Sequence, residues 1–277
     1  MKILLLSKFS ETDEFVLQFA GKLAQKQEVE IEVLHVINAY SEVPLKDDGT
    51  IIDHCVDFDL TSLLKRKQAM ETLCEDWRTR SSHISRSSVQ IGHLQKVVEY
   101  KLKHQSFDAV FMGAHPTNFL EDLIRNTTIE RIMGVSEIPV LSLKCDRSNE
   151  KVIERIGVFN DFDGEEPKEI KLVSAIARAF DAEVHLYKIL SASEAVNMPV
   201  LENRMNAFAA KNKLEKVSHH VLNEKGSEEE QMNRHLLTEK LNLVVVPEIH
   251  RKSMSWIYPK DLKTALANHL FAPLIIY

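Results

Sequence analysis

The chain has 277 residues, of which 44% are hydrophobic and 27% charged, a composition typical of a globular protein with one large domain or two ordinary ones. A net charge of −6 gives no electrostatic reason to expect nucleic acid or an anionic membrane as a partner, and no segment approaches the roughly 20 apolar residues of a membrane helix. The three cysteines are odd in number, far apart and not at zinc-ligand spacing, so we expect no disulfide framework and a cytoplasmic protein.

The first elements in chain order are a strand, a helix and a second strand. The apolar run Lys2–Ser7 predicts a buried strand, and Val29–Ile37 predicts the next one. Between them we expect a helix from Thr12 to about Gln25, with the Thr12 hydroxyl as its N-cap.

A polar excursion, Ser41–Asp59, separates the second strand from a helix expected at about Leu60–Arg80. A loop of this length in a compact domain is either functional or poorly ordered. We expect a mobile decoration, and a lid over a binding site is the alternative that the sequence leaves open.

The stretch Asp108–Lys144 reads as a βαβ unit. A short apolar run, Ala109–Met112, ends at Gly113, a helix-period segment follows, and the strand Ile138–Leu143 closes the unit. Ligands of such units usually lie at the carboxyl end of the first strand, near the helix N-terminus. A small-molecule site is therefore expected at Gly113–Thr127.

The second half of the chain repeats the first. The distance from Ile3 to His35 equals that from Ile156 to Lys188, so the two openings align without a gap. Gly113 and Pro139 are separated by as many residues as Pro247 and Pro273, so the endings align too. One half is therefore interpreted as a diverged copy of the other, and the excursion is the part that the second copy lacks.

Each half alternates strands with helices, with third strands near Ile84–Ile91 and Lys216–Leu222 and following helices at about Leu94–His104 and Glu228–Lys240. This pattern predicts an α/β fold with two tandem, doubly wound, parallel five-stranded sheets. We expect domains at 1–146 and 152–277. The closing strands are apolar edges that need a partner, so we expect them to pair within one chain as a pseudo-two-fold, with a further homodimer as an option.

The sequence resembles the universal stress protein family in its tandem form at several motifs. Phe9-Ser10-Glu11 after the first strand and Leu34-His35-Val36 in the second match the family, as do Met112-Gly113, Thr127, Glu130-Arg131 and the strand after Pro139. The resemblance covers essentially the whole chain, and it implies a Rossmann-like fold and dimerisation through the last strand.

The resemblance also implies ATP or another nucleotide as a ligand. It assigns the phosphate contact to Gly113, Asn126 and Thr127, places Val36 beside the base, and adds His115 to the cofactor-binding set. The chain departs from the family's motif, because Lys8 stands for an Asp, and Pro116 and Asn126 stand for two of its glycines. Pro116 offers no N–H to a phosphate.

The second copy departs differently. Asp161 holds the family's Asp position, but Pro247, His250 and Lys260 replace its three glycines and Asp261 replaces its Ser or Thr. A basic rim of His250, Arg251, Lys252 and Lys260 could still face an anion, although an ordinary solvated loop is the favoured reading.

Other chemistries have little support in the sequence. The twelve histidines show no helical i, i+4 pair with a carboxylate, so no metal site is expected. Receiver-domain, Gly-x-Ser-x-Gly and His-x-Gly-His signatures are missing. We therefore expect a cytoplasmic, non-catalytic stress-response module that binds unknown proteins; the alternative is an ATP-binding sensor, and a nucleotide-hydrolysing or adenylyl-transferring enzyme is a distant third.

Overall fold

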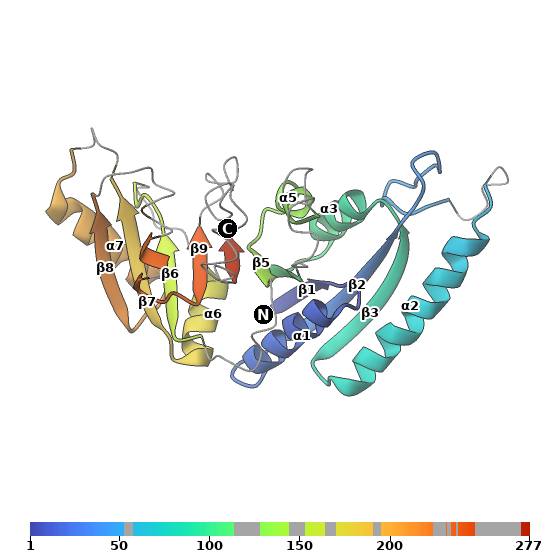
Figure 1. Cartoon of the computed structure of the whole chain (residues 1–277), viewed down its shortest axis with the longest axis horizontal. Coiled ribbons are helices and arrows are strands. Elements are labelled where there is room, and N and C mark those ends of the chain that lie inside the picture. Colours follow the sequence, from blue (N-terminus) through green and yellow to red (C-terminus); the bar gives the residue numbers. More distant parts are fainter. Residues whose placement is uncertain are drawn as a thin grey trace. The chain divides into compact units, whose positions relative to one another are not determined.

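The computed structural model divides the chain into two compact units, Met1–Leu143 and Lys144–Tyr277, each of which is described by itself (Figure 1). The described residues are 1–52, 58–113, 128–143, 153–163, 170–190, 195–223, 231, 234–236, 238–246 and 273–277.

The first unit is a five-stranded parallel sheet with the order β3-β2-β1-β4-β5. Its strands are β1 (Lys2–Leu6), β2 (Glu30–Asn38), β3 (Ile84–Gly92), β4 (Ala109–Gly113) and β5 (Val140–Leu143). Its helices are α1 (Glu11–Ala24), α2 (Thr61–Arg80), α3 (Leu94–His104) and α5 (Thr128–Met133). Right-handed crossovers place α1 and α2 on one face of this sheet and α3 and α5 on the other, in agreement with the contact between α3 and α5. The doubly wound prediction is confirmed.

The first helix begins at a capping box that sequence reasoning did not identify. Ser10, not Thr12, is the N-cap, and its hydroxyl accepts the Asp13 backbone N–H while the Asp13 carboxylate reaches back to the Ser10 N–H. Thr12 is buried in the first turn. The prediction of Thr12 as N-cap is wrong because the pattern Ser10-x-x-Asp13 satisfies two backbone donors where a threonine cap would satisfy one.

The excursion after β2 is a folded part of the core where it is described. Leu45 and Ile51 form an antiparallel bridge, and Thr50 bridges to Gly92 at the end of β3. Val43 and Ile51 are 3% and 4% exposed and belong to the hydrophobic cluster under α2. The expected mobile decoration is therefore wrong for 41–52, because two apolar side chains in a polar segment suffice to attach it to the sheet.

The second unit has the same strand order, β10-β9-β6-β7-β8 when read from its closing strand. Its strands are β6 (Arg155–Phe159), β7 (Glu183–Ile189), β8 (Val217–Leu222), β9 (Leu243–Val246) and β10 (Leu274–Ile276), and its helices include α6 (Lys171–Phe180) and α7 (Met198–Lys211). Phe162 has a left-handed backbone with φ of 54°, as Phe9 has in the first unit with 57°. A duplicated domain would retain both features.

The strands β7 and β8 of the second unit carry a stack of rings. His185 Nδ1 and His220 Nε2 are 2.9 Å apart, and the rings of Tyr187 and His220 stack with their centroids at 4.5 Å. The His235 ring lies 5.8 Å from Tyr187. Burial and the neighbouring His185 lower the pKa of His220, while the nearby Glu239 opposes and His235 and His219 reinforce that shift.

We expect this stack to make the second unit less stable in mild acid. The unfolded chain takes up a proton at His220 as the pH falls through about 6.5, whereas the folded state resists it, so stability present above that pH is lost as the pH falls toward the lower folded-state pKa. Hydrogen exchange of β7 and β8 peptides should be faster at pH 5.5 than at pH 7.5, after correction for the intrinsic rate. A His220→Gln variant should lose less protection between these two values, and equal losses would contradict the assignment.

Among the described residues, the structure contains no helix with the length and hydrophobicity of a transmembrane span.

Candidate functional site

The carboxyl ends of β1, β2 and β4 meet at one edge of the first unit's sheet, where β1 lies between β2 and β4. This is the edge at which open α/β sheets bind their ligands. Of the five predicted nucleotide-site residues, Val36 and Gly113 lie among the described residues. His115, Asn126 and Thr127 lie outside them, as does Pro116.

Gly113 ends β4 directly against the first turn of α1. A methyl group on Gly113 would lie 2.6 Å from Asp13 Oδ1 and 3.1 Å from Thr12 Cγ2. Asp13 is 3% exposed, and a core carboxylate of this kind cannot move aside freely. Packing of β4 against α1 therefore requires a glycine at this position whether or not a phosphate binds nearby.

Val36 lies in β2, half-buried and opposite Gln90 of β3. Because side chains alternate along a strand, Val36 shares the sheet face of Glu32, whose carboxylate contacts Lys101 of α3. His35 shares the opposite face with the α2 helix. The structure thus places these two consecutive residues on different sides of the sheet.

His35 is held at the end of β2 by the chain that leaves β1. Its Nδ1 lies 2.6 Å from the Ser7 carbonyl oxygen, and its ring lies 5.4 Å from the Phe9 ring, which packs edge-on against Trp77 of α2. Burial and the positive charges of Arg66 and Lys8 lower the pKa of His35, against the Ser7 hydrogen bond and Asp13, which raise it.

The left-handed Phe9 is fixed by hydrogen bonds on both sides. Its N–H donates to Ser7 Oγ at 2.8 Å, and the Lys8 and Ser10 N–H groups both donate to Asp13 Oδ2, at 2.8 and 3.0 Å. A non-glycine residue with positive φ is strained and persists only where its surroundings hold it. These hydrogen bonds therefore fix the backbone of the turn between β1 and α1.

In the second unit, Asp161 holds the position equivalent to Lys8, and an internal lysine engages it. Lys188 Nζ donates to Asp161 Oδ1 at 2.9 Å, and the Lys188 side chain is 4% exposed. The gap-free repeat aligns Lys188 with His35, but it gave no sign that Lys188 would reach Asp161. The predicted topology could have suggested this pair, because both residues lie at the carboxyl ends of adjacent parallel strands.

A second contact at this edge comes from the last residue of the sequence. Asn160 Nδ2 donates to Tyr277 Oη at 2.6 Å, and burial raises the pKa of the Tyr277 hydroxyl. The replaced glycine positions and basic rim residues of the second copy, 247, 250–252, 260 and 261, lie outside the described residues. Among the described residues, no group of three or more potential ligands could hold a metal ion.

Comparison with known proteins matches residues 1–144 to the model of the universal stress protein family. The whole chain is similar in structure to a universal stress protein from Archaeoglobus fulgidus DSM 4304, with a TM-score of 0.66 and 15% identity over 99% of this chain and 95% of that one. It is also similar to a functionally unknown protein from Pseudomonas aeruginosa PAO1, with a TM-score of 0.59 and 14% identity over 99% and 91% of the two chains.

A third similar structure is the cytoplasmic domain of a prokaryotic cation chloride cotransporter, with a TM-score of 0.52 and 15% identity over 99% of this chain and 94% of that one. No curated protein matches the chain. At these identities the structural neighbours establish the fold, and the family model establishes membership. The chain belongs to the universal stress protein family.

Proposed function

We propose that this chain is a tandem, cytoplasmic stress-response module without catalysis of its own, which has lost nucleotide binding and acts by binding proteins. The observation that carries the proposal is the Lys188–Asp161 ion pair at 2.9 Å. A carboxylate at this strand end could accept a hydrogen bond from a nucleotide, but here Oδ1 of the half-exposed Asp161 already accepts one from the buried Lys188 ammonium group, which also compensates its charge.

The first unit supports the same proposal because it lacks the aspartate altogether. Its residue at the equivalent position is Lys8, which has no acceptor to offer and carries the opposite charge. The carboxylate that does lie beside Gly113 is Asp13, and its Oδ2 accepts three hydrogen bonds from Lys8 and Ser10. Neither described strand end thus presents a carboxylate without a partner to a base or ribose.

Calorimetric titration with ATP and magnesium, and separately with AMP, tests the loss of nucleotide binding. We expect no saturable heat and no thermal shift at millimolar nucleotide, and no release of phosphate from ATP. The Thr127→Ala variant should behave like the parent chain. A dissociation constant in the micromolar range would overturn the proposal.

The alternative is a nucleotide sensor that uses the Gly113–Thr127 segment of the first unit. Its support is the position of Gly113, which ends β4 at the ligand-binding edge of the sheet. In that case the titration saturates and Thr127→Ala weakens the binding about tenfold, because a hydroxyl contact to a charged phosphate stabilises by roughly 1.5 kcal/mol. Turnover of ATP with magnesium would instead favour the third reading, a hydrolysing or adenylyl-transferring enzyme.

Pairing of the two closing strands within one chain, and a homodimer of chains, remain predictions. Sedimentation equilibrium of the full chain measures whether it forms the homodimer.

A further inference from the structure

Strand β3 has an outer edge that no described strand covers. It is the last strand in the order of the first unit, and β2 is its neighbour on one side only. The Gly92 carbonyl oxygen accepts the Ala39 N–H and so points toward β2. Because backbone groups of successive residues point to alternate sides of a strand, the N–H and C=O groups of Ser87 and Val89 point away from β2. Among the described residues, none forms a backbone hydrogen bond with these outward groups.

The excursion after β2 occupies the carboxyl end of the same edge. Thr50 forms an antiparallel bridge with Gly92, and the Ile51 N–H donates to the Ile91 carbonyl oxygen at 3.0 Å. The described pairing ends there, and Ile52, which follows, is 40% exposed. A further segment can therefore continue this pairing in the same antiparallel direction, along β3 toward its amino end.

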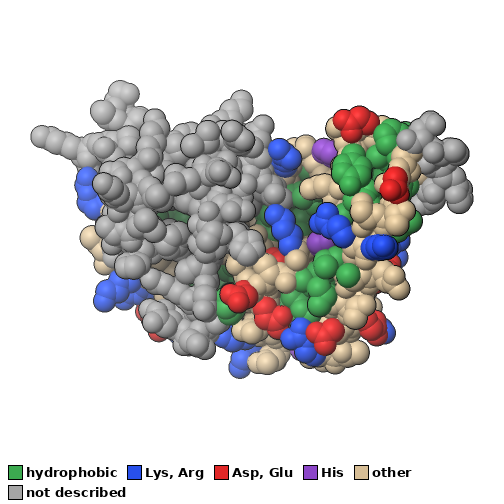
Figure 2. All heavy atoms as spheres, turned by 45° about the vertical axis from the view of Figure 1, so that its right-hand side comes forward, with side chains coloured by type: hydrophobic (Ala, Val, Ile, Leu, Met, Phe, Trp, Pro, Cys, Tyr) green, Lys and Arg blue, Asp and Glu red, His purple; other side chains and the backbone are tan. Residues whose placement is uncertain are grey.

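Helix α2 covers one face of the sheet at this edge, because it packs mainly on β3 (Figure 1). One flank of α2 faces the β1–α1 turn, where the Trp77 ring contacts Phe9. On the same flank Arg80 pairs with Glu14 of α1. Helical periodicity places Leu64 on the opposite flank, beside the outer edge of β3, and Leu64 is 54% exposed. Figure 2, in which the side with α2 comes forward, shows hydrophobic side chains next to Lys and Arg side chains.

The other face of the sheet carries a positive charge at this edge. Arg86 of β3 is 65% exposed, and its nearest described carboxylate contact is with Glu32 Oε1 at 3.8 Å. That oxygen lies 2.6 Å from Lys101 Nζ, and Lys2 contacts the second oxygen at 3.7 Å. The neighbouring Glu30 accepts a hydroxyl group of β3 instead. Arg86 is therefore the exposed cation of this group, and it shares its nearest carboxylate with two others.

We propose that the outer edge of β3 binds an extended segment of a partner protein as an added antiparallel strand, with a carboxylate opposite Arg86 and apolar residues opposite Ser87 and Val89. Directly paired residues of two strands lie on the same face of a sheet. The carboxylate of the partner thus meets Arg86, and its apolar side chains lie on the α2 face near Leu64. Backbone hydrogen bonds provide the affinity of such an added strand, and the alternate side chains provide its specificity.

This inference rests on the proposed function, since it names the surface with which a protein-binding module holds its partner. The two can fail separately. If the edge binds no added strand and the nucleotide titration stays silent, this surface is wrong and the loss of nucleotide binding stands. If an added strand binds and nucleotide binds as well, the surface is retained and the loss of nucleotide binding is wrong.

Site-resolved amide hydrogen exchange of the full chain, measured by NMR, tests the added strand. The probe is the synthetic peptide acetyl-Thr-Val-Thr-Val-Glu-Thr-amide, which in antiparallel register places its valines opposite Val89 and Ser87 and its glutamate opposite Arg86. In the free chain, the Ser88 and Gln90 amides point toward β2 and should exchange more slowly than those of Ser87 and Val89. Saturating peptide should slow the exchange of Ser87 and Val89, and unchanged exchange at these two amides would overturn the proposal.

Binding of the fluorescently labelled peptide to variants locates the contacts. Ser87→Pro should weaken binding at least about tenfold, because proline removes an outward N–H and is tolerated on the unpaired side of an edge strand. Unchanged protection of Ser88 in this variant shows that β3 remains folded. Arg86→Ala should weaken binding about threefold, the size of a cross-strand charge pair, and replacing the peptide's glutamate by glutamine should have no further effect in that variant.

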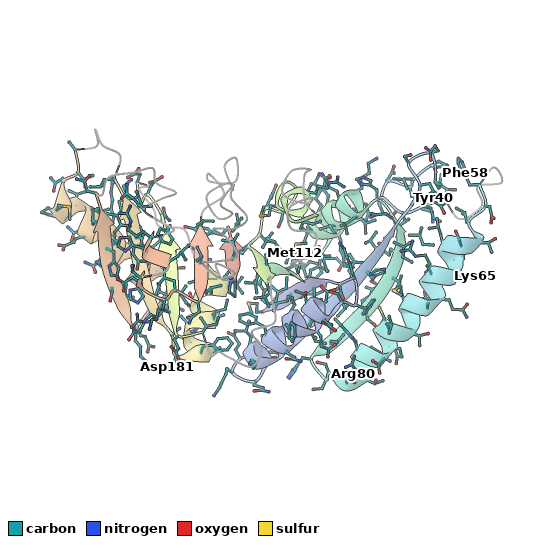
Figure 3. All side chains as sticks on the ribbon, in the orientation of Figure 1. Tyr40, Phe58, Lys65, Arg80, Met112 and Asp181 are labelled. Atoms are coloured by element: carbon teal, nitrogen blue, oxygen red, sulfur yellow. The ribbon has the colours of Figure 1, made fainter. Side chains whose placement is uncertain are left out.

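Lys65→Ala is the matched control for the charge. Lys65 is exposed on α2, two residues after the buried Leu63 and so on the side of the helix turned away from the sheet (Figure 3). Its removal should change peptide binding less than about twofold, since salt screens a charge at that distance. An equal loss in Lys65→Ala and Arg86→Ala would overturn the assignment of the carboxylate to Arg86.

Sedimentation of the same variants distinguishes a partner protein from a second copy of the chain. Self-association that Ser87→Pro abolishes would make a second copy the occupant of the edge and overturn the proposal. Self-association that Arg86→Ala strengthens would also overturn it, because Arg86 would then protect the edge from pairing. We expect neither variant to change the sedimentation of the chain.

Discussion

Replacing Glu32 by alanine should destabilise the first unit by about 3–5 kcal/mol, the usual effect of removing one partner of a buried ion pair. Glu32 lies in the middle of β2 and is 1% exposed. Its Oε1 is 2.6 Å from Nζ of Lys101, which α3 buries against the sheet, and Lys2 and Arg86 add longer contacts at 3.7 and 3.8 Å. Without Glu32, the buried ammonium group of Lys101 has lost its closest counter-charge.

Hydrogen exchange of β2 peptides reads the stability of this unit separately from the other. Faster exchange throughout β2 in Glu32→Ala is the expected result. The double variant Glu32→Leu with Lys101→Met should recover most of the loss, because replacing a buried pair by apolar residues of similar size is often neutral or stabilising. The matched control is Glu99→Ala, which breaks the exposed pair with Lys103 on α3 and should cost less than about 1 kcal/mol. Similar losses in the two single variants would show that burial of Glu32 has no special effect.

The second large effect is expected at Asp13, which holds the β1–α1 turn. An Asp13→Ala variant leaves the Lys8 and Ser10 N–H groups and the Ser10 hydroxyl without their common acceptor. Hydrogen bonds to a charged group contribute about 1.5–3 kcal/mol each, and some of these donors regain water in the variant. We expect a loss of about 3 kcal/mol, together with release of the left-handed conformation of Phe9.

The aromatic contacts of Phe9 provide a second measurement for this variant. Because Phe9 packs against both His35 and Trp77, Asp13→Ala should also shift the His35 NMR signal and change the environment of Trp77. Glu11→Ala is the control, since it removes an exposed carboxylate from the same first turn and should cost less than about 1 kcal/mol. Loss of stability with unchanged His35 and Trp77 signals would show that Asp13 acts only as a helix cap.

The sequence by itself determined the order of the strands and helices, the α/β class and the family. These are local properties, because a short apolar run such as Ala109–Met112 and a helix-period segment such as Leu94–His104 are recognisable without knowing their neighbours. The motif around Met112-Gly113 likewise needs no tertiary information. The doubly wound arrangement follows from the alternation of these elements, since parallel strands require crossover helices.

Only the tertiary structure decided which side chains meet. The partners Asp161 and Lys188, Glu32 and Lys101, and Gly113 and Asp13 are far apart in the sequence, and their contacts depend on strand register and on which sheet face a helix covers. The excursion after β2 was misjudged for the same reason, because its polar composition hides Val43 and Ile51, whose burial depends on a cluster formed by β2, β3 and α2. The pairing and burial of charged side chains at the strand ends thus result from packing, and only the three-dimensional structure reveals them.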